Sequence, residues 1–201
     1  MENSRVFSLI LVVILVSFLG FVVENIFTLI MGRKIDNRNM ILPFLLGYGL
    51  SILVIYRLFG TPNSPLLFGK EIEINHIFFS IFYYFSVTFL CVSIGELILG
   101  HLIERTCQIK WWNYSNLPLH ITRYTSIPTS TLFAVLITLF MKFLFSPLLS
   151  YFSRLNPRML SITAVSLIVL LSIDFVHSAI YMFTNHKILQ IWKYEFKNKR
   201  L

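Results

Sequence analysis

Residues 6–23 read VFSLILVVILVSFLGFVV, and this stretch contains no charged side chain. A helix needs about 20 mostly apolar residues to cross a bilayer, because each residue advances it by about 1.5 Å and the hydrocarbon core is about 30 Å thick. The apolar region of a signal peptide is shorter and precedes a small-residue cleavage site, which this stretch lacks. We therefore predict that residues 6–31 form a transmembrane helix of the mature protein.

Four further stretches are long and apolar enough to cross a membrane. The composition agrees, since 56% of residues are hydrophobic and 13% are charged, whereas an ordinary soluble domain has roughly 25% charged residues. No internal repeat or low-complexity linker separates the stretches. The sequence predicts the all-α class, a polytopic integral membrane helix bundle of about five transmembrane helices in one transmembrane domain, residues 1–201. The predicted spans are 6–31, 40–59, 76–103, 126–152 and 159–183, followed by a basic cytoplasmic tail, 186–201.

The distribution of Lys and Arg predicts the orientation. The connections on one side of the membrane, with the tail, carry eleven of these residues, and the opposite side carries five. Because basic loops stay in the cytoplasm, we predict a multi-pass protein of the cell membrane with its N-terminus outside and its C-terminus in the cytoplasm. In the tail, Ile188, Trp192 and Phe196 recur at helical spacing among lysines, which favours either a basic amphipathic helix or a frayed tail.

Ionisable side chains inside the predicted spans are the candidate functional residues, because a lone charge in hydrocarbon is costly. Spans one, three and five cross in the same direction, and each carries such residues in its later part. We therefore predict one polar cluster in the cytoplasmic half of the bundle. The alternative is a set of separate interhelical hydrogen bonds. The cluster residues are Glu24, Glu96, Glu104, Asp174 and His177.

Several kinds of site are not indicated. The net charge of +8 fits membrane loops and lipid headgroups, and no nucleic-acid-binding signature accompanies it. The chain has no Gly-x-x-x-x-Gly-Lys-Ser/Thr phosphate loop and no Gly-x-Ser-x-Gly nucleophile motif. His101 with Glu104, and Asp174 with His177, have the spacing of metal ligands but complete no recognised set. We expect no metal, no cofactor and no nucleic-acid partner, and the sequence assigns no catalytic residue.

Two groups of short motifs occur between Gly20 and Phe133. The first group comprises Gly20-x-x-x-Glu24, Gly32-Arg33-Lys34, Asn37-Arg38, Pro43 and Gly47-Tyr48-Gly49. The second comprises Gly95-Glu96, Glu104, Trp111-Trp112-Asn113-Tyr114-Ser115 and Pro118. Together they resemble the CmpB-like family of bacterial membrane proteins, described as putative ABC-transporter type IV permeases. The chain resembles a diverged member, because Asn113 stands where the family usually has Asp and residues 120–128 depart from the family pattern.

Aromatic and basic residues of these motifs suit a membrane interface. The Trp and Tyr rings are typical of an aromatic belt at headgroup level, and the arginines either bind lipid phosphates or pair with Glu104. Anchoring and orientation of the protein alone is the simpler interpretation. The interfacial motif residues are Asn37, Arg38, Trp111, Trp112, Asn113, Tyr114 and Arg123.

The resemblance implies a permease-like transport subunit, whose polar cluster would line a path for a substrate or ion. Since five spans are few for a complete transporter, we expect a separate ATPase subunit or self-association, besides membrane lipids as partners. Two other functions remain open. One is a membrane-embedded enzyme acting on a lipid-linked substrate, with Glu24, Glu96 or His177 as general acid or base. The other is a non-catalytic assembly factor or sensor. A non-enzymatic role is favoured.

Overall fold

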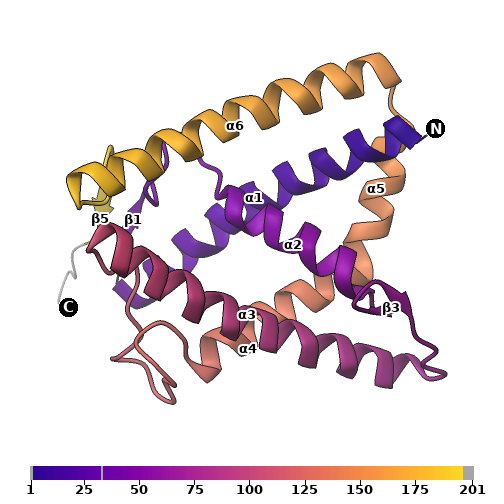
Figure 1. Ribbon diagram of the computed structural model, residues 1–201, viewed down its shortest axis with the longest axis horizontal. Coiled ribbons are helices and arrows are strands. Elements are labelled where there is room, and N and C mark those ends of the chain that lie inside the picture. Colours follow the sequence, from indigo (N-terminus) through magenta and orange to yellow (C-terminus); the bar gives the residue numbers. More distant parts are fainter. Residues whose placement is uncertain (1, 33, 197–201) are drawn as a thin grey trace. The chain divides into compact units, whose positions relative to one another are not determined.

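Helices make up most of the computed structural model, which describes residues 2–32 and 34–196 (Figure 1). In chain order, its elements are α1 (Glu2–Gly32), β1 (Lys34–Asp36), α2 (Leu46–Phe59), β2 (Gly60–Thr61), β3 (Ser64–Leu67), β4 (Lys70–Glu71), α3 (Ile77–Cys107), α4 (Ile127–Leu139), η1 (Phe140–Leu144), α5 (Phe145–Ser153), α6 (Pro157–Asn185) and β5 (Lys193–Glu195). Four helical stretches are long and apolar enough to cross a membrane, one of them being α4, η1 and α5 in continuity, and α2 is a shorter apolar helix. The predicted all-α membrane fold is confirmed.

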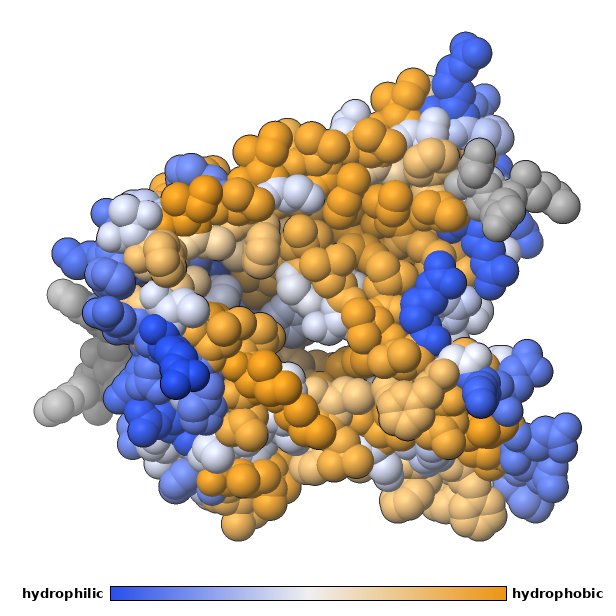
Figure 2. Space-filling view, viewed as in Figure 1, coloured by the Kyte–Doolittle hydropathy of each residue, from blue (hydrophilic) through white to orange (hydrophobic). Residues whose placement is uncertain are grey.

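The chain divides into two compact units. The first unit contains Met1–Ser51 and Phe152–Leu201, and the second unit contains Ile52–Tyr151. Large apolar side chains remain exposed along the long helices, as surfaces that face lipid require; Ile173 of α6 is 65% exposed and Phe78 of α3 is 72% exposed. Figure 2 shows apolar side chains along the length of α6, with hydrophilic ones near its ends. That both units form one transmembrane domain stays a prediction.

The helix ends have local causes in the sequence. Asn156 caps α6, because its side-chain oxygen accepts the backbone N–H groups of Arg158 and Met159. Ser126 caps α4 in the same way by accepting the N–H of Thr129. Each cap is followed by a proline in the first two helical positions, where its missing N–H is not needed.

A π-helical segment, η1, interrupts the third of the four long helical stretches just before Pro147. Proline has no N–H, and its ring clashes with the carbonyl one turn earlier, so the preceding turn must widen. In a π-helix each N–H donates to the carbonyl five residues earlier, so a proline at position 147 leaves the carbonyl of Lys142 without its helical donor. The side-chain amide of Asn63 donates to that carbonyl over 3.3 Å instead. The irregular turn therefore has both a cause and a compensating hydrogen bond.

A small sheet, ordered β2-β3-β4, connects α2 to α3. Both of its pairings are antiparallel, and Gly60 begins it with a φ of 68° that favours glycine. The hydroxyls of Ser80 and Tyr84 in the first turns of α3 donate to the backbone carbonyls of Pro62 and Gly60. The connection is thereby attached to the start of α3.

The second predicted span, 40–59, is only partly helical. Helix α2 begins at Leu46, and residues 40–45 are non-helical. Pro43 explains the late start, because the residue before a proline is restricted to extended conformations. Apolar composition alone could not distinguish these six positions from helix.

Helices α1 and α6 run in the same direction within their unit. The strands that follow them, β1 and β5, pair antiparallel with Lys34 opposite Glu195 and Asp36 opposite Lys193. The C-terminal ends of both helices therefore lie at the same end of the unit. This is the parallel arrangement predicted for the first and fifth spans, and it is consistent with counting the short α2 as a crossing. Which end faces the cytoplasm stays a prediction.

The predicted C-terminal amphipathic helix is wrong for the described part of the tail. Helix α6 ends with His186 in the left-handed conformation, and residues 193–195 form β5. Pairing with β1 outweighs the helical spacing of the apolar residues, because the strand satisfies its backbone groups against a neighbour already in place. The segment is not frayed either. Arg33 and residues 197–201, which contribute to the predicted basic side, lie outside the described residues.

Helix α2 packs closely on α1 through glycine. A Cβ atom on Gly49 would lie 2.2 Å from the carbonyl oxygen of Val13 and 2.5 Å from the Ser17 hydroxyl oxygen. Small residues permit such backbone approach between membrane helices, where no hydrophobic force drives association. Gly47, two residues earlier and on another face of the same helix, has nothing within 4 Å of its Cβ position.

We predict that Gly49→Ala destabilises the protein by about 1–3 kcal/mol, the usual cost of overpacking. The matched variant Gly47→Ala should be neutral or slightly stabilising, because alanine favours helix over glycine. Unfolding in detergent by denaturant titration measures both. Equal stability of the two variants would contradict the packing described here.

Candidate functional site

A tight turn at the entry to the non-helical segment places the first functional candidates. Residues 37–40 form a turn closed by the Met40 N–H on the Asn37 carbonyl over 2.9 Å. Arg38 and Asn39 both have positive φ, 48° and 67°, which is the type I′ geometry. Asparagine tolerates it, but arginine adopts it only at a cost of about 1–3 kcal/mol. Interactions of the Arg38 side chain and backbone must therefore hold the turn.

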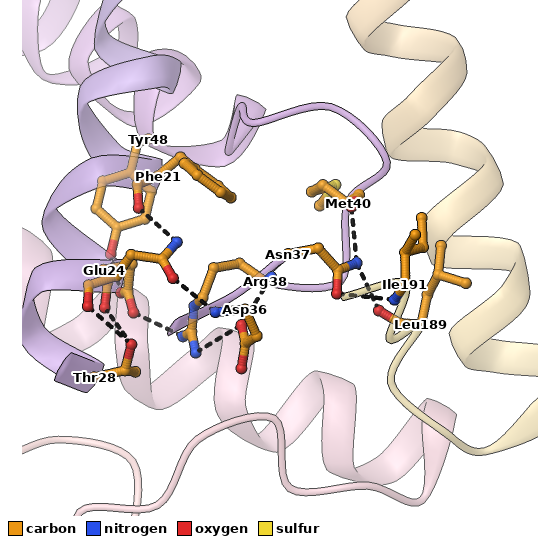
Figure 3. Close-up of polar contacts among 11 residues, drawn as sticks. Phe21, Glu24, Thr28, Asp36, Asn37, Arg38, Met40, Tyr48, Leu189 and Ile191 are labelled. Atoms are coloured by element: carbon orange, nitrogen blue, oxygen red, sulfur yellow. Dashed lines mark hydrogen bonds and ion pairs between the residues drawn. The ribbon is translucent and has the colours of Figure 1, made fainter. Parts of the chain in front are cut away.

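Glu24 of α1 supplies the main such interaction (Figure 3). The Arg38 guanidinium donates to its carboxylate over 2.7 Å. The Arg38 side chain is 16% exposed and that of Glu24 is 14% exposed. The Tyr48 hydroxyl donates to the other oxygen of the same carboxylate. Asp36 adds a second carboxylate, 3.9 Å from the guanidinium, and accepts the Arg38 backbone N–H. Glu24 thus joins α1, the turn and α2.

The ring of Tyr48 reaches Glu24 because Gly20 lies one helical turn before it. A Cβ atom at position 20 would lie 2.5 Å from Tyr48 Cγ. The Gly-x-x-x-Glu spacing therefore has a geometric meaning: the glycine provides the surface on which the ring lies, and the glutamate accepts the hydroxyl at its tip.

Two asparagines attach the C-terminal segment to the turn. Asn37 is 2% exposed, and its side chain accepts the Ile191 N–H and donates to the Leu189 carbonyl. Asn39 is 1% exposed and accepts the Leu189 N–H over 2.7 Å. Figure 3 shows the Asn37 side chain in contact with Met40, Leu189 and Ile191. The chain after α6 is therefore held to the turn by side-chain amides in addition to the β1–β5 pairing.

Asp174 of α6 holds the non-helical segment itself. Its two carboxylate oxygens accept the backbone N–H groups of Ile41 and Leu42 over 3.0 and 2.9 Å. The Asp174 side chain is buried, and the hydroxyl of Ser178 one turn later donates to it. Both N–H groups precede Pro43, where no helix can take them up.

The segment reaches the depth of the middle of α1. The Leu45 N–H donates over 2.9 Å to the carbonyl of Ser17, which is the central residue of α1. A cavity of about 210 Å³ lies beside the segment and is bordered by side chains from α1, the segment and the C-terminal strand region. Its lining residues are Phe21, Asn37, Met40, Ile41, Leu42, Pro43 and Trp192.

The second unit holds the other predicted carboxylates. Glu96 of α3 accepts a hydrogen bond from the Tyr114 hydroxyl over 3.3 Å and one from Ser130 of α4 over 3.4 Å. Glu104 pairs with Arg123 over 3.0 Å, as one of the two interpretations of the arginines anticipated. The indole N–H of Trp112 donates to the carbonyl of Tyr124, which orders the connection between α3 and α4.

The arrangement around Glu104 repeats the one around Glu24. A Cβ atom on Gly100, one turn before Glu104, would lie 2.3 Å from Tyr124 Cγ. Arg123, from the connection to the next helix, pairs with the glutamate, as Arg38 does in the first unit. Burial and the nearby Glu104 carboxylate raise the pKa of Tyr124 to about 12. Each unit thus contains one Gly-x-x-x-Glu helix face with a tyrosine on the glycine and an arginine on the glutamate. The spacing from Gly to Tyr differs between them, which is why no repeat was visible in the sequence.

The structure brings some predicted residues together and separates others. Glu24 holds the turn at Arg38, and Asp174 holds the backbone of Ile41 and Leu42 that follows it. His177, predicted to accompany Asp174, is exposed. Convergence of Glu96 and Glu104 with this cluster stays a prediction. Tyr48 and Asp36 belong to the network but were not predicted; the Gly47-Tyr48-Gly49 motif was the available signal for Tyr48. Among the described residues, no group of three or more His, Cys, Asp and Glu could hold a metal ion.

The comparison with protein families covers most of the chain. A family model described as "Putative ABC-transporter type IV" matches residues 11–179. No curated protein and no solved structure matches. The matched range includes Glu24, Asn37, Arg38 and Asp174, together with the counterpart arrangement at Glu104.

We predict that Asp174→Asn exposes the Ile41 and Leu42 amides to hydrogen exchange. The amide side chain offers one acceptor where the carboxylate offers two, and each buried N–H left unpaired costs about 1–3 kcal/mol. Exchange followed by mass spectrometry should show faster deuteration of peptides that cover residues 40–45. Glu73→Gln, in the exposed connection before α3, is the control and should leave these peptides unchanged. Unaltered protection in Asp174→Asn would refute the assigned role.

Proposed function

The chain belongs to the family described as putative ABC-transporter type IV, and from this premise we propose that it is a permease-like transport subunit in which the segment 36–45 forms part of the substrate or ion path. The observation that carries the proposal is the non-helical backbone of residues 40–45 at the depth of the middle of α1.

Such backbone is rare within a membrane for an energetic reason. An unpaired N–H or C=O costs several kcal/mol in hydrocarbon, so non-helical segments occur only where protein buries them or where they line an aqueous cavity. Transporters use interrupted helices in this way, because the freed backbone groups and helix ends can bind a substrate or ion. A purely structural helix would gain nothing from the interruption.

Charged groups at both ends of the segment support the same interpretation. Asp174 accepts N–H groups of the segment, and Glu24 pairs with Arg38 in a largely shielded setting. A carboxylate paired inside a membrane protein is more often part of a path or relay than a stabilising element. Binding of a cation to Glu24 would weaken its attraction for Arg38 and so release the turn.

The energy source would lie in another chain. This sequence has no phosphate-binding loop, so ATP-driven transport requires a separate ATPase subunit. A tagged chain purified in mild detergent should then carry ATP hydrolysis that is absent from a mock purification. Self-association is the alternative route to a complete transporter.

The lipid-linked-substrate enzyme is the second candidate, and the apolar lining of the 210 Å³ cavity beside Asn37 favours it. An enzyme of this type would need one of the carboxylates within reach of the bound substrate. Binding of a lipid-linked substrate in the cavity, with loss of turnover in Glu24→Gln, would distinguish it from a permease.

We predict that a water-filled path makes Ile41→Cys reactive toward a charged, membrane-impermeant methanethiosulfonate in a background without Cys91 and Cys107. The thiolate is the reactive form and needs water to ionise. Ile180→Cys on α6 is the matched control, because Ile41 and Ile180 are similarly exposed in the fold, 50% and 60%. Reaction should be about tenfold or more faster at position 41, since a cysteine facing lipid stays protonated.

The comparison is conservative. Ile180 lies closer to the C-terminal end of α6 than Asp174, the residue that accepts the Ile41 N–H. The control position is therefore the nearer of the two to a membrane surface, where water would favour its reaction. Equal rates at both positions, or no reaction at either, would contradict the proposed path.

A further inference from the structure

We propose that Arg123, with His101 and Lys110, binds the phosphate of an anionic lipid headgroup at the end of α3. The inference starts from the two matching arrangements, which differ in one respect. In the first unit the arginine has two carboxylates in reach and is shielded, whereas in the second it has one acid partner and remains open.

The charges around the two arginines differ. Arg38 has two carboxylates in reach, from Glu24 and Asp36, and its side chain is 16% exposed. Arg123 pairs with Glu104 alone among the described acids, and its side chain is 48% exposed. A guanidinium carries five N–H donors, and one bond to a carboxylate oxygen leaves most of them able to bind another anion.

Further positive charge surrounds Glu104. Lys110 and His101 both act electrostatically on its carboxylate, in addition to Arg123. Both residues are exposed. One carboxylate therefore lies among the cationic side chains of Arg123 and Lys110 and the ring of His101, and the remaining positive charge attracts an anion.

Aromatic rings give the cationic group a fixed frame. The Arg123 guanidinium lies 5.9 Å from the centroid of the Tyr124 ring, and the His101 and Tyr124 ring centroids are 5.0 Å apart. Tyr124 is itself fully buried against Gly100 and contacts Trp112. The side chains of Arg123 and His101 thus pack against a buried, fixed ring.

The position favours a lipid over free phosphate. His101 shares a helix face with Ile98 and Ile94, at one and two turns toward the middle of α3. These two apolar side chains are 59% and 54% exposed, so an acyl chain can lie along them while its phosphate meets the cationic group. Arginine and tryptophan at the end of a membrane span suit this headgroup depth.

The test measures lipid retention by the full chain. Protein reconstituted with equal amounts of phosphatidylglycerol and phosphatidylcholine is extracted in mild detergent, and bound lipids are counted by native mass spectrometry. Wild type should retain phosphatidylglycerol in preference to phosphatidylcholine. Arg123→Gln should lose this preference several-fold, and Arg154→Gln, an exposed arginine beyond α5, should retain it.

Glu104→Gln separates binding from fold maintenance. It removes the competing carboxylate, so retention of phosphatidylglycerol should equal or exceed that of wild type. If Glu104→Gln and Arg123→Gln lose the lipid equally, the pair is structural and the proposal is overturned. Unchanged retention in Arg123→Gln overturns it as well.

A parallel arm adds millimolar inorganic phosphate during extraction. Persistence of the bound phosphatidylglycerol supports a lipid site, and its displacement would show a site for free phosphate instead, against the proposal. The experiment measures lipid binding at the end of α3, so its failure leaves the cysteine-reactivity test of the proposed path unaffected.

Discussion

Backbone N–H groups that leave a helix inside a membrane must find acceptors, and the first unit depends on how it meets this requirement. Asp174 accepts the N–H groups of Ile41 and Leu42. The charge of the carboxylate makes both bonds stronger than a neutral acceptor would. Once these groups are satisfied, the chain can extend to the depth of Ser17 before α2 begins. The non-helical course of residues 41 and 42 depends on this contact.

The recurring combination of glycine, glutamate, tyrosine and arginine gives each unit its connection between helices. The glycine permits the ring to lie on the helix backbone, and the glutamate holds the arginine of the connecting segment. The two copies differ in shielding: the arginine of the first has a second acid in reach and is 16% exposed, and the arginine of the second, at the end of α3, is 48% exposed. This difference in environment, rather than in residue type, is why we assign the first to a path within the membrane and the second to a lipid headgroup.

Much of the fold could be predicted because it follows from local properties. Apolar run length determined the long helices, and intramembrane charge identified Glu24 and Asp174 as exceptional. Caps such as Asn156 and Ser126 were also readable in principle, because their effect acts over a few residues. The amphipathic-helix interpretation of residues 188–196 was wrong because strand pairing joins segments far apart in the chain, and helical spacing in Ile188, Trp192 and Phe196 carries no information about a partner strand.

By itself, the sequence determined that this is a helical membrane protein and where most of its spans lie. It also identified the carboxylates within spans, which need polar partners. These properties depend on the cost of placing polar groups in hydrocarbon, which each stretch incurs independently. Only the tertiary structure decided that Asp174 serves the backbone of residues 41 and 42, that Glu24 takes Arg38 and Tyr48, and that Glu104 takes Arg123. A carboxylate accepts any suitable donor, so the choice of partners is made by the packing that brings particular donors within hydrogen-bond distance and leaves the others out of reach.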